Sequence, residues 1–474
     1  MLGNPIKNRP MFKNLIIKEI QLNLKNLRFQ IAFFIVLLVF IIGALFNIKE
    51  TRQKQEMYSK YQKEWLSDVR KQGEYNASNL ATRTTDCVMR PRDNSFMSDC
   101  KERFIPNLIM YSAFNVYGFD VKQSISNPLL NRFEEINWSF IVIFVISLLA
   151  LLLTFDAVSG ERESHTLALY FTNQISRAQV LFSKWLSVIL LISITLLAGI
   201  FISLIIQIIG KAIVFNNTVI VESCFFLFFS ILLTALMSCI GLFCSVMATT
   251  SNVSLLYALM FWLLFSLVIP NTSVLWAEKL FPILHADNIE QQKSIKREQI
   301  DKSYPAGRWS SSSNPFMPEH KIRAAMQMDF MLSDKQINDS YYQTMFNQYE
   351  RSRDITSISP LSLFGYSMET ITGGGYLRFQ YNWNALHVYQ QQFLAFFKNF
   401  DEKDKDSPHW YNPYENYSTT RKPIKFEEMP LYTEKIVPLS NRITKMAFYS
   451  GLLLIYVFLA FAVTFIKFVR SDVR

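Results

Sequence analysis

Six long apolar segments divide the chain. An α-helix rises about 1.5 Å per residue, so about 20 apolar residues are enough to cross the hydrocarbon core of a bilayer. The apolar segments are close to that length and lie at residues 30–48, 137–154, 185–209, 223–247, 252–270 and 445–469. We therefore predict an all-α polytopic membrane protein with six transmembrane helices.

Polar segments separate these spans, and their charges indicate an orientation. Two are long, residues 49–136 and 271–442, and one is a shorter connector, residues 155–184. Lys and Arg are concentrated before the first span and after the last. By the positive-inside rule, both chain ends are cytoplasmic, and so is the connector. We predict a multi-pass protein of the cell inner (cytoplasmic) membrane, with both long segments extracytoplasmic.

Residues 1–29 have an amphipathic pattern. Phe12, Ile16, Ile20 and Leu24 recur at steps of four, with basic residues between them. This spacing predicts a helix that lies on the cytoplasmic membrane surface with its basic groups toward anionic headgroups. An ordinary soluble helix is the alternative, and it is disfavoured because the segment runs directly into the first span.

The two long polar segments are predicted to form a mainly helical extracytoplasmic domain. Within the second segment, residues 361–365 are apolar enough to approach the membrane again. The aromatic residues between 376 and 397 are interpreted as core or a membrane-interface belt, in preference to a ligand site. Helical periodicity is found at residues 50–70, 288–304, 318–351 and 376–400.

Composition supports the membrane assignment and argues against nucleic-acid binding. Half of the 474 residues are hydrophobic, and the formal net charge is +10. Lys and Arg are spread between the termini and the polar segments, without a dense basic run or a basic-aromatic nucleic-acid module. We attribute the excess of cations to membrane-facing positions and predict no nucleic-acid partner.

The sequence contains no familiar catalytic or nucleotide-binding motif. The patterns G-x-x-x-x-G-K-[ST], H-E-x-x-H and G-x-S-x-G are all missing from it. The five His residues are far apart; His320, His387 and His409 could converge in space, but a structural role is favoured for each. We predict that the chain is not an enzyme and holds no cofactor or metal.

The connector at residues 155–184 carries the most specific pattern. It has the order FD-x-x-SGER-x-x-x-TL, followed by ISR and a Lys. This pattern resembles the first cytoplasmic loop of type-2 ABC transporter permeases, the ABC-2 family. The branch with large extracytoplasmic insertions after spans one and five is the most similar. The chain departs from the pattern at His165, where a Gly would be expected before Thr166.

The resemblance implies a function for the connector and for the chain. It implies a permease subunit that exports or extracts a substrate across a lipid bilayer, together with a second permease chain, either an identical copy or a paralogue. An ABC ATP-binding subunit would hold ATP and Mg and dock on the connector. Glu161 and Arg162 have no buried partner visible in the sequence, so we expect them to face this subunit; the alternative is a solvated turn without function. The residues implied to couple ATP use to the spans are Asp156, Gly160, Glu161, Arg162, Thr166, Arg177 and Lys184.

The positions of the cysteines predict one disulfide. Cys87 and Cys100 fall in the first external segment, so they alone are placed to meet an oxidising compartment, and we predict that they pair. A metal site is the alternative, but two Cys with no His nearby are a weak ligand set. Cys224, Cys239 and Cys244 fall in spans and are predicted to be buried apolar residues.

Two functions stay open at this point. One is transport, and the other is that of a non-transporting membrane anchor that transmits force between a cytoplasmic ATPase and an envelope partner. The spans are almost free of internal charge. This disfavours an ion pathway and is compatible with a lipidic cargo or with force transmission.

Overall fold

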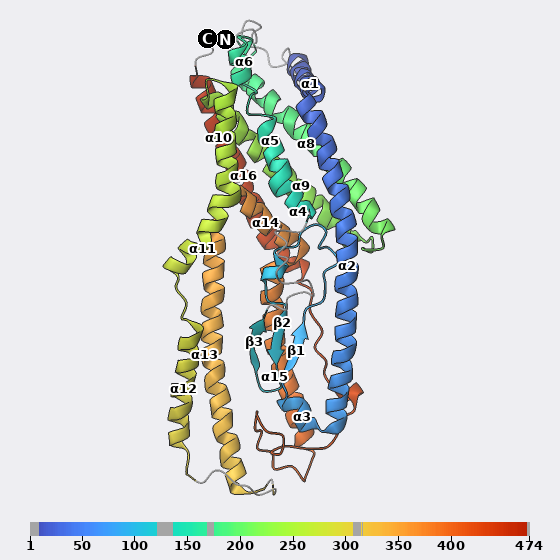
Figure 1. Cartoon of the computed structure of the whole chain (residues 1–474), viewed down its shortest axis with the longest axis vertical. Helices are drawn as coiled ribbons and strands as arrows, with labels where there is room; N and C mark the ends of the chain where they lie inside the picture. The colour runs from blue at the N-terminus through green and yellow to red at the C-terminus, as the bar shows by residue number, and fades with distance from the viewer. Residues whose placement is uncertain (1–8, 121–135, 168–174, 307–313, 315, 472–474) are drawn as a thin grey trace.

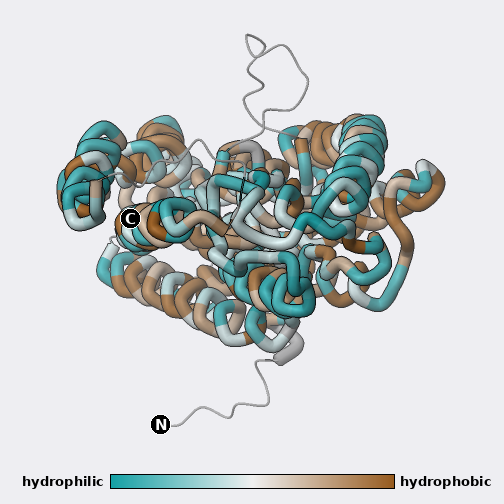
Figure 2. Tube along the Cα trace, turned by 90° about the horizontal axis from the view of Figure 1, so that it is seen from below, coloured by the Kyte–Doolittle hydropathy of each residue, from teal (hydrophilic) through white to brown (hydrophobic). Residues whose placement is uncertain are grey.

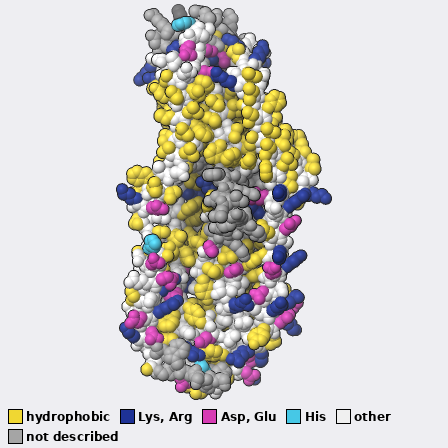
Figure 3. Space-filling model, viewed as in Figure 1, with side chains coloured by type: hydrophobic (Ala, Val, Ile, Leu, Met, Phe, Trp, Pro, Cys, Tyr) yellow, Lys and Arg dark blue, Asp and Glu magenta, His cyan; other side chains and the backbone are white. Residues whose placement is uncertain are grey.

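The protein is elongated, and most of its helices run along the long axis (Figure 1). The computed structural model describes residues 9–120, 136–167, 175–306, 314 and 316–471. Apolar side chains cover most of the upper part, whereas Lys, Arg, Asp and Glu are dispersed over the lower part (Figure 3). We call the upper part the membrane half and the lower part, which contains the three labelled strands, the distal half.

The helices of the membrane half confirm an all-α polytopic membrane protein. A shorter apolar helix, Trp138–Leu152, occupies the place of the second predicted span. Among the described residues, five helices are long and apolar enough to cross a bilayer. They are α2 (Leu27–Tyr75), α8 (Arg177–Ile209), α9 (Asn217–Met247), α10 with α11 (Ser251–Leu280) and α16 (Leu439–Arg470).

Two of the apolar helices contain a π-helical stretch. In the first, Ile141–Ile146 separates α4 (Trp138–Phe140) from α5 (Ser147–Leu152). In the second, Leu264–Val268 separates α10 (Ser251–Leu263) from α11 (Ile269–Leu280) and ends two residues before Pro270. Because Pro has no backbone N–H, the α-helical hydrogen bond at that position cannot form, and the helix changes its winding there.

The largest apolar cluster of the membrane half contains Trp138. The Trp138 ring lies 5.0 Å from that of Phe96 and 5.2 Å from that of Phe226, and its Nε1 donates to Ser203 Oγ at 2.8 Å. Helix α14 (Pro360–Thr372) also belongs to this core and packs against α9 and α16. Residues 361–365 therefore pack among the apolar helices, as their composition predicted. The buried side chains that α14 adds are Leu361, Leu363, Phe364, Met368 and Ile371.

Helices α1 and α2 connect the two ends of the molecule. Helix α1 (Arg9–Lys25) packs on α8 and exposes Leu22 and Leu24. Asn26 then caps α2 by accepting a hydrogen bond from the backbone N–H of Arg28. Helix α2 runs without interruption for 49 residues from the membrane half into the distal half. The helix predicted at residues 50–70 is thus part of the same helix as the first span.

The distal half combines helices with a small sheet that the sequence did not predict. Helix α3 (Ala77–Thr82) leads into three antiparallel strands in the order β1 (Thr85–Val88), β2 (Leu108–Tyr111) and β3 (Val116–Asp120). Phe119 of β3 lies 4.8 Å from the ring of Tyr342 and 5.4 Å from that of Trp383. The sheet therefore packs on the helices that carry those two residues.

Three helices of the distal half confirm helices predicted from the sequence. They are α12 (Ala286–Ser303), α13 (Pro318–Thr356) and α15 (Gly375–Asp401). The aromatic residues of α15 are largely core, because Phe379, Trp383, Phe393 and Phe397 are buried. Gly373 ends α14 in the left-handed conformation, at a φ of 62°, where glycine is favoured. In Figure 2, seen from the distal end, the nearest turns are mostly hydrophilic and the helices behind them are largely hydrophobic.

Candidate functional site

The connector after α5 lies at the end of the membrane half that is farthest from the sheet (Figure 1). Its backbone is fixed by two serines from other helices. Ser245 Oγ of α9 accepts hydrogen bonds from the backbone N–H groups of Val158 and Ser159, both at 2.9 Å. Ser254 Oγ of α10 donates to the carbonyl oxygen of Phe155 at 2.5 Å. The start of the connector is therefore attached to both helices.

The short helix α6 (Ser159–Glu163) joins a buried ion-pair cluster. Lys184 Nζ of α8 lies 2.7 Å from Glu161 Oε1 and 3.3 Å from Glu19 Oε1 of α1. The Lys184 and Glu19 side chains are only 5% and 7% exposed, and that of Glu161 is 20% exposed. A cation at this depth depends on its carboxylate partners, because an unpaired buried charge costs several kcal/mol. The cluster thus ties α1, α6 and α8 together.

Two further side chains of α6 bind the turn between α9 and α10. Arg162 Nη1 donates to the carbonyl oxygen of Ala248 at 2.8 Å. Glu163 Oε2 accepts a hydrogen bond from Ser251 Oγ at 2.7 Å. The long charged connector and the short neutral turn at residues 248–254 therefore form one contact surface.

Asp156 and Arg177 make the remaining links. Asp156 Oδ2 pairs with Arg28 Nη1 at 2.7 Å, and both side chains are partly exposed, so the pair adds about 1 kcal/mol or less. Arg177 Nη1 donates to the carbonyl oxygens of Phe468, Val469 and Ser471. It thereby binds carbonyl groups that the C-terminus of α16 leaves free.

Within the described part of the connector, four successive exposed residues, Glu163, Ser164, His165 and Thr166, form what we call the tip. His165 has a φ of 56°, in the left-handed region that favours glycine, which accounts for the Gly expected at this position. The backbone N–H of Thr166 donates to the carbonyl oxygen of Glu161 at 2.9 Å and closes the turn. Residues 168–174 of the connector lie outside the described residues.

The structure gives Glu161 and Arg162 partners within the chain that were not visible in the sequence. Glu161 pairs with Lys184, and Arg162 binds the carbonyl oxygen of Ala248. A Cβ added at Gly160 would make ordinary contacts of 3.5 Å with Ser251 Oγ and 3.7 Å with Asp156 Cβ, so sterics do not require glycine there.

Sequence reasoning missed the partners supplied by distant segments. Nothing in the sequence marked three of these partners, because Ser and Ala are common in apolar spans and short turns. They are Ser245, Ser251 and the carbonyl oxygen of Ala248. Glu19 was marked, since it is the only acidic residue among residues 1–28. An isolated carboxylate in a basic segment that precedes a span indicates a specific cationic partner.

The predicted disulfide is not formed in the structure. Cys87 and Cys100 are both free thiols and have different neighbours. Cys87 lies on β1 with its Cα opposite that of Ile109, whereas Cys100 Sγ lies 3.3 Å from Thr372 Oγ1 at the end of α14. Burial raises the pKa of the Cys87 thiol to about 12 and that of the Cys100 thiol to about 11. Cys239 and Cys244 are buried as predicted, but Cys224 is exposed.

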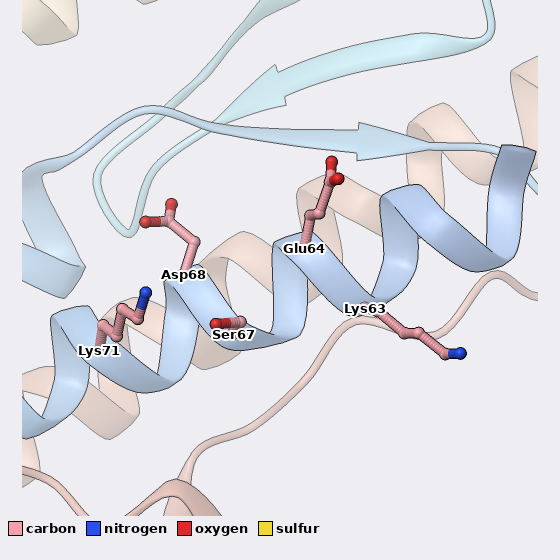
Figure 4. Close-up of a pocket in the computed structure, with 5 residues that line it drawn as sticks. All are labelled: Lys63, Glu64, Ser67, Asp68 and Lys71. Atoms are coloured by element: carbon pink, nitrogen blue, oxygen red, sulfur yellow. The ribbon is translucent and has the colours of Figure 1, made fainter.

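The three histidines considered from the sequence have different neighbours, and His320 Nδ1 lies 3.2 Å from Arg323 Nη2. His387 and His409 have separate local partners, the carbonyl oxygen of Trp383 and the carboxylate of Asp401. Within the described residues, no group of three His, Cys, Asp or Glu side chains is placed to hold a metal. A depression on α2 is lined by charged and polar residues of that helix alone, and Figure 4 shows Lys63 pointing away from Glu64 and Asp68.

Comparison with known families covers nearly the whole chain. The family model described as ABC-2 family transporter protein matches residues 13–473. The match includes α1, every apolar helix, the connector and the distal half. Among curated proteins, no sequence matches the chain.

Proposed function

Because the chain belongs to the ABC-2 family of transporter proteins, we propose that it is a permease subunit that exports or extracts a substrate with energy from ATP. ATP and Mg are held by a separate ABC ATP-binding subunit. Two permease chains, identical or paralogous, complete the transporter in the inner membrane. In this arrangement the ends of the chain and the connector are cytoplasmic, and the distal half is extracytoplasmic.

The tip at residues 163–166 is the proposed docking point for the ATP-binding subunit. The observation that carries this proposal is that the tip is exposed while the residues directly before it are bound to other helices. All four tip residues are exposed. The α6 residues directly before them are bound to α1, α8 and the 248–254 turn through Glu161 and Arg162. A movement of the tip would therefore displace several helices at once. Such a joint displacement is needed if the helices of the membrane half are to change from one packing arrangement to another.

The proposed roles of these connector residues divide into three groups. Glu163 and Thr166, in the tip, would contact the ATP-binding subunit. Glu161, Arg162 and Lys184 would carry the movement into the helices. Asp156 and Arg177 would hold the two ends of the connector in place.

The test is ATP hydrolysis by the transporter purified from native membranes through a tag on this chain. Reversing the tip charge with Glu163→Lys should reduce co-purification of the ATP-binding subunit or the hydrolysis rate, because docking depends on charge complementarity. Glu298→Lys, an exposed reversal in α12 of the distal half, is the matched control. Equal hydrolysis and equal co-purification in both variants would refute docking at the tip.

Force transmission without transport is the second candidate function. The observation that favours it is α2, a single helix that runs from the membrane half to the distal half. A continuous helix can carry a movement over its whole length. The two candidates differ in one result, since a force-transmitting anchor would hydrolyse ATP in reconstituted vesicles without moving any lipid, peptide or ion across them.

A further inference from the structure

A cavity of about 770 Å³ lies where the distal half meets the membrane half. Its walls come from α13, α14, the start of α15, the first turns of α16 and the segment that follows α11. Helices α11 and α16 belong to two of the candidate membrane spans. The cavity is therefore next to the surface where those spans would leave the bilayer, and it is separate from the connector.

The inner wall of the cavity is polar and fixed. Arg353 Nη1 donates to both carboxylate oxygens of Glu369, at 2.8 and 2.9 Å. The two side chains are 14% and 6% exposed. Glu369 Oε1 also accepts a hydrogen bond from the backbone N–H of Leu377. This pair is held from both α13 and α15 and therefore forms a pre-organised polar wall.

Tyrosine rings surround the Arg353 guanidinium. Its carbon lies 4.3 Å from the ring centroid of Tyr366, 5.8 Å from that of Tyr376 and 5.9 Å from that of Tyr349. The Tyr376 hydroxyl is buried and has no hydrogen-bond partner of good geometry among the described residues. A buried hydroxyl without a partner costs free energy, so a ligand that bonds to it would gain affinity.

The rim of the cavity is apolar on the side of the spans. Phe448 of α16 is 66% exposed, and Phe281, directly after α11, is 40% exposed. Both line the cavity. Exposed Phe side chains beside the membrane spans pack more favourably against a lipid acyl chain than against water.

The charges on the open side are balanced. Arg351 and Lys445 line the cavity together with Glu350 and Asp354. Arg351 and Asp354 form only an exposed pair at 3.5 Å, which leaves these charges available to a ligand. Two cations and two carboxylates favour a headgroup that carries both signs over one that is only anionic.

We propose that this cavity binds the headgroup of a zwitterionic phospholipid, with the acyl chains along Phe448 and Phe281. The phosphate would lie near Lys445 and Arg351, and the ammonium near Glu350 and Asp354. This site is independent of the ATP-binding subunit, and the proposal holds whether or not the lipid is transported.

The test is lipid retention by the purified full-length chain in detergent, measured by native mass spectrometry. The probes are phosphatidylethanolamine, phosphatidylglycerol with the same acyl chains, and soluble glycerophosphoethanolamine as a competitor. Asn347→Trp places a bulky side chain at an exposed position in the lining of the cavity. Ser340→Trp, an exposed position on the same helix that is not part of the lining, is the matched control.

We expect retention of phosphatidylethanolamine in preference to phosphatidylglycerol. Affinity should fall about tenfold with Asn347→Trp and should be unchanged with Ser340→Trp. Lys445→Glu is a second, exposed variant that should also weaken binding of phosphatidylethanolamine. Equal retention of the two lipids would overturn the zwitterionic assignment. Displacement by the soluble competitor at equal concentration would overturn the role of the acyl chains, and equal binding by both Trp variants would overturn the site.

Discussion

Glu161 and Lys184, which stand at opposite ends of the connector, meet in an ion pair of 2.7 Å, with Lys184 only 5% exposed. Glu19 completes the cluster from α1. Helices α6 and α8 are therefore joined beside the tip, and all four tip residues, 163–166, are exposed. This relationship ties the part of the connector that carries the tip to helices α1 and α8.

The first prediction concerns Lys184. Lys184→Met should destabilise the protein by about 3–5 kcal/mol, because Glu161 and Glu19 would stay buried without their cation. Adding Glu161→Gln and Glu19→Gln should recover much of that loss. The measurement is thermal unfolding of the purified protein. If Lys184→Met melts like the wild type, the cluster does not support the connector.

The second prediction concerns His165, whose φ is 56°. His165→Gly should leave stability unchanged or raise it by up to about 1 kcal/mol, because glycine adopts this conformation without strain. His165→Val should lower stability, since a β-branched residue is strained there. Both changes are read by thermal unfolding. The opposite order of the two variants would contradict the left-handed turn.

The third prediction concerns Arg177, which donates to three carbonyl oxygens at the end of α16. Arg177→Met should speed hydrogen exchange in the last turn of α16, because charge-assisted hydrogen bonds worth about 1.5–3 kcal/mol are lost. Lys467→Met, an exposed change in the same turn, is the control. Equal exchange in the two variants would show that Arg177 does not hold this helix end.

The fourth prediction concerns the two thiols of the distal half. Their raised pKa values, about 12 for Cys87 and about 11 for Cys100, keep both thiols neutral at pH 8. Alkylation of the folded protein should therefore be slow at pH 8 and should accelerate as pH rises toward 11, since the thiolate is the reactive form. Ser340→Cys, at an exposed position, should react quickly. A Cys87–Cys100 peptide in an unreduced digest would contradict the free thiols.

The sequence predicted the helices of the membrane half well, because hydropathy reports directly on burial in lipid. It did not predict that α2 is continuous. The change from apolar to charged residues near Lys49 marks a change of surroundings, whereas the helical hydrogen bonds continue through it. The sheet was missed because β1 and β2 have only four residues each, too few for a clear alternation.

The site shows the same division between local and distant information. The connector and its turn were recognisable from adjacent residues, including the glycine-like position of His165. The buried partners of Glu161 and Arg162 were not, because Lys184 lies 23 residues further along the chain and Glu19 and Ala248 come from two other segments. Charge pairing between distant helices depends on their packing, which hydropathy does not encode.

The central claim is that the tip at residues 163–166 contacts an ATP-binding subunit. The most direct measurement is photo-cross-linking in native membranes from a photoreactive residue at position 165, with an exposed control position, Gln343, on α13. The account predicts an adduct at position 165 with a chain that contains a G-x-x-x-x-G-K-[ST] motif, identified by mass spectrometry, and none at position 343. No adduct with such a chain at position 165, or the same adduct at both positions, would contradict it.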